Sequence, residues 1–95
     1  MRKMSLREFT AMVTKILRTF GVYKDYRSEI ARIYVSTKVS PQVAAFLLLR
    51  EREKMNIKYR TYADVVGINP NTLRKSYLSL LKRGGILIEY KSSYR

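Results

Sequence analysis

The chain has 95 residues and a mass of 11.2 kDa, which is the size of one domain with one modest core. It contains no cysteine and no histidine, so it has no disulfide, no thiolate or imidazole ligand for zinc, and no Ser-His catalytic pair. Its 20 Lys and Arg residues against 7 Asp and Glu residues give a net charge of +13. That surplus predicts a polyanionic partner, with nucleic acid ahead of an anionic membrane surface. We predict that the chain is not an enzyme and uses no cofactor and no metal.

The hydropathy of the chain argues against a membrane protein. No run of about 18 apolar residues is present, and the N-terminus leads into an amphipathic stretch rather than the apolar centre of a signal peptide. We therefore expect a cytoplasmic, nucleoid-associated protein with no membrane partner. A peripheral membrane role for the first amphipathic helix stays open as an alternative.

The first predicted helix is marked at both ends. Ser5 and Glu8 form a capping-box pattern, and Gly21 is a typical stop signal. Between them, apolar residues recur at spacings of three and four and predict one apolar face. These residues, which are candidates for the core or for a dimer interface, are Leu6, Phe9, Val13, Ile16, Leu17 and Phe20.

Two more helices are predicted before residue 56. The first spans about residues 25–35, and the second begins with Ser40 as N-cap and Pro41 in the first helical position. Residues 43–49 are all apolar, so this helix is expected at the centre of the core. The charged residues 50–54 predict a solvated turn, and the alternation around residues 57–59 predicts one short strand.

A helix-turn-helix pattern follows. Thr61 is predicted to cap a short helix that ends at residue 66, Gly67 supplies the turn, and Asn69 with Pro70 opens a helix that runs to about residue 83. Ala63 is small where the second helix must cross the first. On that second helix, the residues expected to face the core are Leu73, Tyr77, Leu80 and Leu81.

The opposite face of this last helix is polar and basic, as base edges and phosphates require. The candidate DNA-binding residues of this recognition helix are Asn69, Asn71, Thr72, Arg74, Lys75, Ser79 and Lys82. Gly84 and Gly85 then stop the helix, and residues 86–90 are rich in β-branched and aromatic side chains, which predicts a strand.

Residues 62–88 together resemble the winged helix-turn-helix domains of regulators of the PadR, MarR and GntR kinds. The resemblance implies a mainly α fold with a small β wing and two extra N-terminal helices. It implies one domain over residues 1–95, with 1–39 for packing and dimerisation and 40–95 as the winged helix. The wing and flank residues that would contact DNA are Arg60, Thr61, Lys91, Ser92, Ser93 and Arg95.

The function expected from this resemblance is that of a homodimeric, site-specific binder of double-stranded DNA, acting as a transcriptional repressor. One alternative is a plasmid-partition adaptor that binds a centromere, spreads along DNA and recruits a second protein. Another alternative comes from a second resemblance. Five helices, with Tyr62 and Ala63 before the turn and Thr72, Leu73 and Arg74 after it, also look like one cyclin repeat of transcription factor B, which would make the chain a polymerase-binding module.

Overall fold

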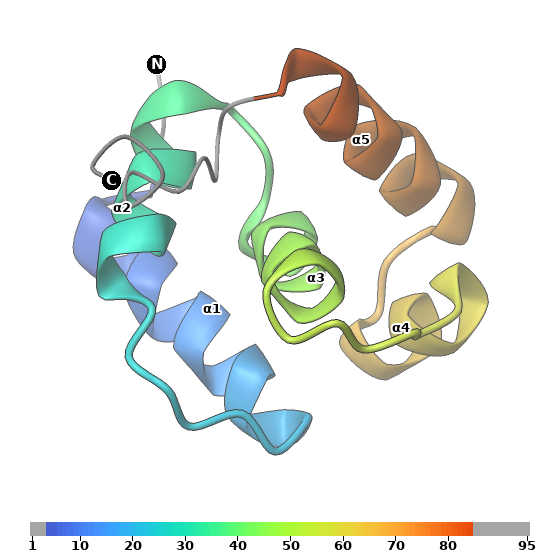
Figure 1. Cartoon of the computed structure of the whole chain (residues 1–95), viewed down its shortest axis with the longest axis horizontal. Helices are drawn as coiled ribbons and strands as arrows, with labels where there is room; N and C mark the ends of the chain where they lie inside the picture. The colour runs from blue at the N-terminus through green and yellow to red at the C-terminus, as the bar shows by residue number, and fades with distance from the viewer. Residues whose placement is uncertain (1–3, 85–95) are drawn as a thin grey trace, which may run out of the picture.

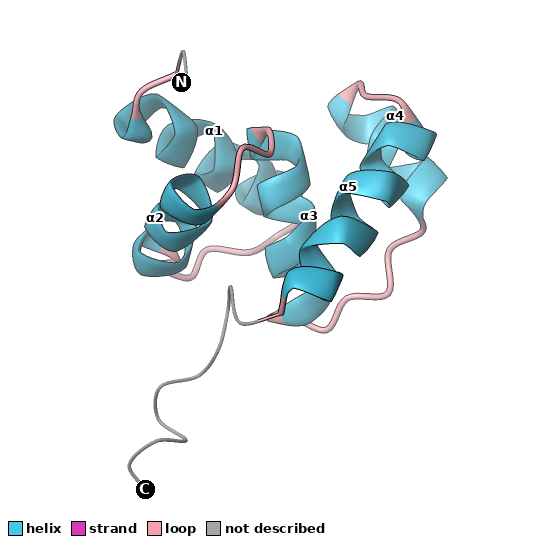
Figure 2. Cartoon of the chain, turned by 90° about the horizontal axis from the view of Figure 1, so that it is seen from above, coloured by secondary structure: helices cyan, strands magenta, loops and turns pink. Residues whose placement is uncertain are grey.

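The computed structural model describes residues 4–84, and in that range the chain forms five α-helices. They are α1 (Leu6–Thr19), α2 (Arg27–Ser36), α3 (Pro41–Glu51), α4 (Tyr59–Val66) and α5 (Pro70–Arg83). Helix α3 lies in the middle, with α1 and α2 on one side and α4 and α5 on the other (Figures 1 and 2). Helix α1 packs on α2 and α3, while α5 packs on α3 and α4.

The predicted mainly α fold with a small β wing is wrong, because every regular element from residue 4 to residue 84 is a helix. The strand expected at residues 57–59 does not form, since no neighbouring strand in the described part of the chain offers it hydrogen bonds. Instead, the carbonyl oxygen of Ile57 accepts a hydrogen bond from Nη1 of Arg50 at 2.8 Å, and Tyr59 begins α4. The wing strand expected at 86–90 lies outside the described residues. So do the wing residues Lys91, Ser92, Ser93 and Arg95.

The start signals of α1 and α3 are confirmed. The hydroxyl of Ser5 accepts a hydrogen bond from the Glu8 backbone at 3.1 Å, and the Glu8 carboxylate accepts one from the Ser5 backbone at 3.0 Å. At α3, the Ser40 hydroxyl accepts from the backbone of Val43, and Pro41 occupies the first turn. These caps satisfy backbone donors that have no partner inside the helix.

Two helix starts differ from the predicted ones. Helix α2 begins at Arg27 rather than at residue 25, because the Asp25 carboxylate bends the chain by accepting the Arg27 backbone N–H at 3.0 Å. Helix α4 begins at Tyr59, two residues before Thr61, so Thr61 lies in the first turn and does not cap the helix. The ring of Tyr59 packs at 5.5 Å from that of Phe46, and this contact places the start of α4 against α3.

The core is built around α3, as predicted from its apolar run. All residues from 43 to 49 are buried, and Phe46 is fully buried at the centre. Its ring centroid lies 4.7 Å from that of Tyr62 on α4 and 5.0 Å from that of Tyr77 on α5. From the other side, α1 contributes the buried side chains of Phe9, Val13 and Leu17. Within residues 4–84, no helix is long and apolar enough to cross a membrane.

Candidate nucleic-acid interface

The turn between α4 and α5 has the geometry that its glycine predicts. Gly67 adopts a left-handed backbone with φ of +75°, which only glycine reaches without strain. The backbone N–H groups of Gly67 and Ile68 both donate to the Ala63 carbonyl, at 2.8 and 3.0 Å. The chain therefore reverses within three residues, and α5 starts at Pro70 beside the end of α4.

Helix α5 is held against the bundle by one side only. Leu73, Tyr77 and Leu80 are buried, and Ala63 beneath the crossing is fully buried, all as predicted. Leu81 was expected to face the core, but 43% of its surface is exposed. Its position, eight residues after Leu73, turns it toward the edge of the contact with α3 rather than into it.

The side chains predicted to contact DNA from within α5 all lie on its solvent side. The exposed ones are Asn71, Thr72, Arg74, Lys75, Ser79 and Lys82, and on α4 Arg60 and Thr61 are exposed as well. This outer face carries no acidic side chain anywhere between residues 65 and 84. The arrangement offers amide, hydroxyl and cationic donors along one helix, next to a tight turn.

Asn69 has a structural task at the start of α5. Its side-chain Oδ1 accepts hydrogen bonds from the backbone N–H groups of Asn71 at 2.8 Å and Thr72 at 3.1 Å. These two donors are unpaired within the helix, so Asn69 acts as the N-cap of α5.

Replacing Asn69 with alanine is expected to lower the free energy of unfolding by about 1 kcal/mol, because the cap is lost. Replacing it with serine keeps an oxygen in place for the same N–H groups, so we expect that variant to recover most of the loss. Urea unfolding at neutral pH measures both differences. Equal stability of the alanine and serine variants would show that the side chain does not cap α5 in solution.

Four of the six acidic side chains within residues 4–84 are engaged with their own neighbours. Glu8 completes the cap of α1, Asp25 binds the Arg27 guanidinium, Glu51 accepts from the Tyr77 hydroxyl, and Glu53 accepts from the Tyr26 hydroxyl and pairs with Lys24. In these pairings, carboxylate groups interact with donors of the same chain and are less available to a partner. The positive surplus therefore dominates the surface that a partner meets.

The charged end of α3 holds α5 in place. It was predicted to be a solvated turn, but the Glu51 carboxylate accepts a hydrogen bond from the hydroxyl of the buried Tyr77. The guanidinium of Arg50 lies 5.2 Å from the ring centroids of Phe46, Tyr59 and Tyr77 and stacks among them. The sequence pattern missed this role, because alternating charges after an apolar run resemble a solvent-exposed helix end.

Helix α4 is anchored through Tyr62. The ring of this fully buried residue stacks on Phe20 of α1 with centroids 5.4 Å apart, and its hydroxyl donates to the Gln42 carbonyl at 2.6 Å. Tyr62 and Tyr77 together fix both helices of the turn motif to α3. These contacts set the position of α5, and so of its exposed face, relative to α3.

Tyr77 also makes the fold sensitive to alkaline pH. Burial, reinforced by the hydrogen bond to Glu51, raises the pKa of Tyr77 to about 12. An unfolded tyrosine titrates near 10, so the folded chain holds this proton more tightly than the unfolded chain. The stabilisation is complete below pH 10 and is lost as pH rises from 10 toward 12. Burial raises the pKa of Tyr26 and Tyr62 in the same direction.

We expect urea unfolding to show a steady loss of stability between about pH 10 and pH 12. A Tyr77→Phe variant should lose less stability over this range, since phenylalanine has no hydroxyl group to ionise at this buried position. Tyr23, which is 74% exposed, provides the matched control, and Tyr23→Phe should reproduce the wild-type pH profile. A wild-type stability that is constant up to pH 12 would contradict the prediction.

The dimer-interface candidates on α1 divide into two groups. Phe9, Val13 and Leu17 are buried within the chain itself, so they belong to its own core. Ile16 and Phe20 are partly buried against that core, and Leu6 is 40% exposed. The outward face of α1 is formed by other residues.

Comparison with protein-family models, with curated proteins and with solved structures finds no match to this chain.

Proposed function

We propose that the chain is a sequence-selective, double-stranded DNA-binding protein that inserts α5 into the major groove. The observation that carries this proposal is the outer face of α5, which is exposed and free of carboxylates, while the buried Tyr77 holds the inner face of the helix against α3. A helix that follows a tight glycine turn and offers such a face matches the geometry of helix-turn-helix recognition. The proposal needs no β wing.

The two ends of α5 have different roles in this proposal. Near the start, Asn71, Thr72 and Lys75 are placed to reach base edges, because the N-terminal part of a recognition helix enters the groove. Lys82 near the end contacts phosphate and sets register without reading sequence. A cytoplasmic transcriptional regulator that acts by occupying its site is the simplest protein of this kind.

The test is binding of fluorescent duplexes measured by anisotropy over a series of salt concentrations. A duplex selected from a random library should bind at least about 1,000-fold more tightly than a random one at fixed salt. Log affinity should fall linearly with log salt, by roughly 0.9 for each phosphate contact. Equal affinity for selected and random duplexes, with Lys75→Ala weakening both alike, would reject sequence-selective binding.

A second candidate function is favoured by the arrangement of the helices. Five helices around a central apolar α3 agree with the resemblance to a cyclin repeat of transcription factor B, which implies a module that binds polymerase and DNA together. Size-exclusion chromatography with purified RNA polymerase separates the two functions. Co-elution of this chain with polymerase in the absence of DNA supports the cyclin-like module, whereas binding to DNA alone supports the regulator.

A further inference from the structure

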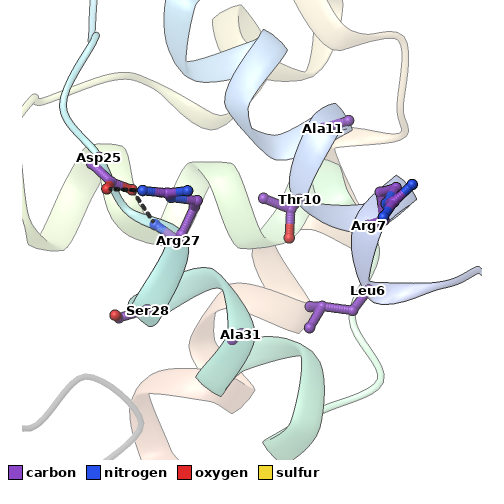
Figure 3. A pocket seen from close by; sticks show the side chains of 8 residues that line it. All are labelled: Leu6, Arg7, Thr10, Ala11, Asp25, Arg27, Ser28 and Ala31. Atoms are coloured by element: carbon purple, nitrogen blue, oxygen red, sulfur yellow. Dashed lines mark hydrogen bonds and ion pairs between the residues drawn. The ribbon is translucent and has the colours of Figure 1, made fainter.

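A groove runs between α1 and α2, on the side of the bundle away from α5. Its volume is about 880 Å³, and its walls come from residues 6–11 of α1 and from the start of α2 (Figure 3). The lining residues are Leu6, Arg7, Thr10, Ala11, Asp25, Arg27, Ser28 and Ala31. A second hollow of about 550 Å³ continues along α1 and shares Ala11 with the first.

The floor of the groove is made of small side chains. In the close view the Thr10 side chain points toward α2, whereas those of Ala11 and Ser28 point away from the opposite helix, and Leu6 lies at one end (Figure 3). Small residues between two packed helices leave a furrow, because the helix axes of such a pair lie about 8–10 Å apart and longer side chains would fill it. A furrow of this kind accepts one side of a further helix.

The charge around the groove is positive. Arg7 lies at its rim, and Lys15 and Arg18 line the continuation along α1. Within residues 4–84, none of these three forms an ion pair. The one carboxylate of the groove, Asp25, is already bound by Arg27 through Nε at 3.0 Å and Nη2 at 2.8 Å (Figure 3). The surface therefore presents unmatched positive charge beside the apolar side chains of Leu6, Ala11 and Ala31.

We infer that this groove is a docking site for an acidic amphipathic helix of a partner protein. The apolar face of that helix would cover Leu6, Ala11 and Ala31, and its carboxylates would meet Arg7, Lys15 and Arg18. Charge complementarity selects an acidic partner over a second copy of this basic chain. The apolar side chains of Leu6, Ala11 and Ala31 select a protein helix over duplex DNA, which has no apolar ridge to place against them.

The position of the groove gives the partner a separate face from the proposed DNA contact. Helix α3 lies between α1 and α5, so an occupant of the groove would not cover the exposed side of α5 (Figures 1 and 2). A chain with this arrangement can hold DNA on one side and an acidic protein segment on the other.

The experiment uses the full chain and a synthetic peptide of about 15 residues, long enough at ~1.5 Å per residue to follow α1. The peptide places leucine and alanine on one helical face and glutamate on the other. A peptide of the same composition in scrambled order, with no apolar face, is its control. Binding is measured by anisotropy, and backbone amide NMR shifts locate the contact.

We expect the amphipathic peptide to bind with a Kd below about 1 mM and to shift amides mainly in residues 6–18 and 25–31. Ala11→Trp fills the exposed floor without changing the charge, and Arg7→Glu with Lys15→Glu reverses the rim. Each change should weaken the peptide by at least about tenfold. Lys75→Glu with Lys82→Glu changes the net charge by the same amount as the rim variant, but on α5. Its affinity for the peptide should stay within about twofold of the wild-type value, once the long-range effect of charge at 0.15 M salt is corrected for.

Three results with the peptide would overturn the inference, and a fourth comes from a DNA duplex. They are no binding below about 1 mM, equal binding of the scrambled peptide, and unchanged affinity in both groove variants when circular dichroism shows them folded. A duplex that shifts the same α1 and α2 amides and displaces the peptide would assign the surface to nucleic acid instead.

Discussion

Replacing Phe46 with alanine is expected to lower the free energy of unfolding by about 3–5 kcal/mol, the cost of removing a fully buried aromatic ring. Phe46 joins the central helix α3 to both α4 and α5, since its ring touches Tyr59, Tyr62 and Tyr77. Its loss leaves a cavity that three other rings cannot fill together. A domain of this size has a total stability of about 5–14 kcal/mol, so the variant should be close to unfolded at 37 °C.

Urea unfolding followed by circular dichroism measures this loss. Phe46→Leu keeps most of the volume and should cost much less. Val35→Ala is the matched surface control, because Val35 is 79% exposed and its truncation should change stability by no more than about 0.5 kcal/mol. If Phe46→Ala is no less stable than Val35→Ala, Phe46 is not the centre of the core in solution.

The largest expected effect on DNA binding comes from reversing two charges on α5. For each phosphate contact, the affinity for DNA falls as the salt concentration to the power of about 0.9. One contact therefore makes binding roughly eightfold tighter at 0.1 M salt than at 1 M salt. Losing the Lys82 phosphate contact should therefore weaken DNA binding by about eightfold. Losing the Lys75 base contact should cost about 1–3 kcal/mol more, which is roughly five- to 150-fold, and the added glutamates should weaken DNA binding further. The slope of log affinity against log salt should become shallower by roughly 0.9, because only Lys82 of the two contacts phosphate.

Arg7→Glu with Lys15→Glu is the matched control for this experiment. Both pairs of substitutions take the net charge from +13 to 13 − 4 = +9, and all four positions are exposed. Arg7 and Lys15 lie on α1, away from α5. Reversing their charges should therefore weaken DNA binding much less than reversing the two charges on α5. Equal weakening by the two pairs would mean that overall charge, and not the face of α5, determines DNA binding.

Local signals in the sequence predicted the helices whose ends are set by single side chains. Ser5 with Glu8, Ser40 with Pro41, and Asn69 with Pro70 each satisfy backbone donors within three residues, so neighbouring sequence is enough to locate them. The left-handed turn at Gly67 is equally local. The exposed face of α5 follows from the same reasoning, because helical periodicity fixes which side chains oppose Leu73 and Tyr77.

The predictions that were wrong depended on distant neighbours. Alternating residues at 57–59 fit a strand, but a strand requires a partner, and here the segment packs on Arg50 and Phe46 instead. The charges after α3 fit a solvated turn, but tyrosines from other parts of the chain bring Glu51 and Glu53 into hydrogen bonds. The spacing of residue types along the sequence carries no information on these hydrogen bonds, whose partners lie 26 and 27 residues apart.

By itself, the sequence determined the positive charge, the absence of cysteine and histidine chemistry, the capped helices and the polar face of α5. Only the tertiary structure decided that every regular element within residues 4–84 is a helix, that Arg50 and Glu51 support α5, and that α1 and α2 line an open groove with a basic rim. The physical reason is the range of the interactions. Caps and periodicity act within one or two helical turns, whereas the ring cluster and the groove exist only after helices from different parts of the chain have packed together.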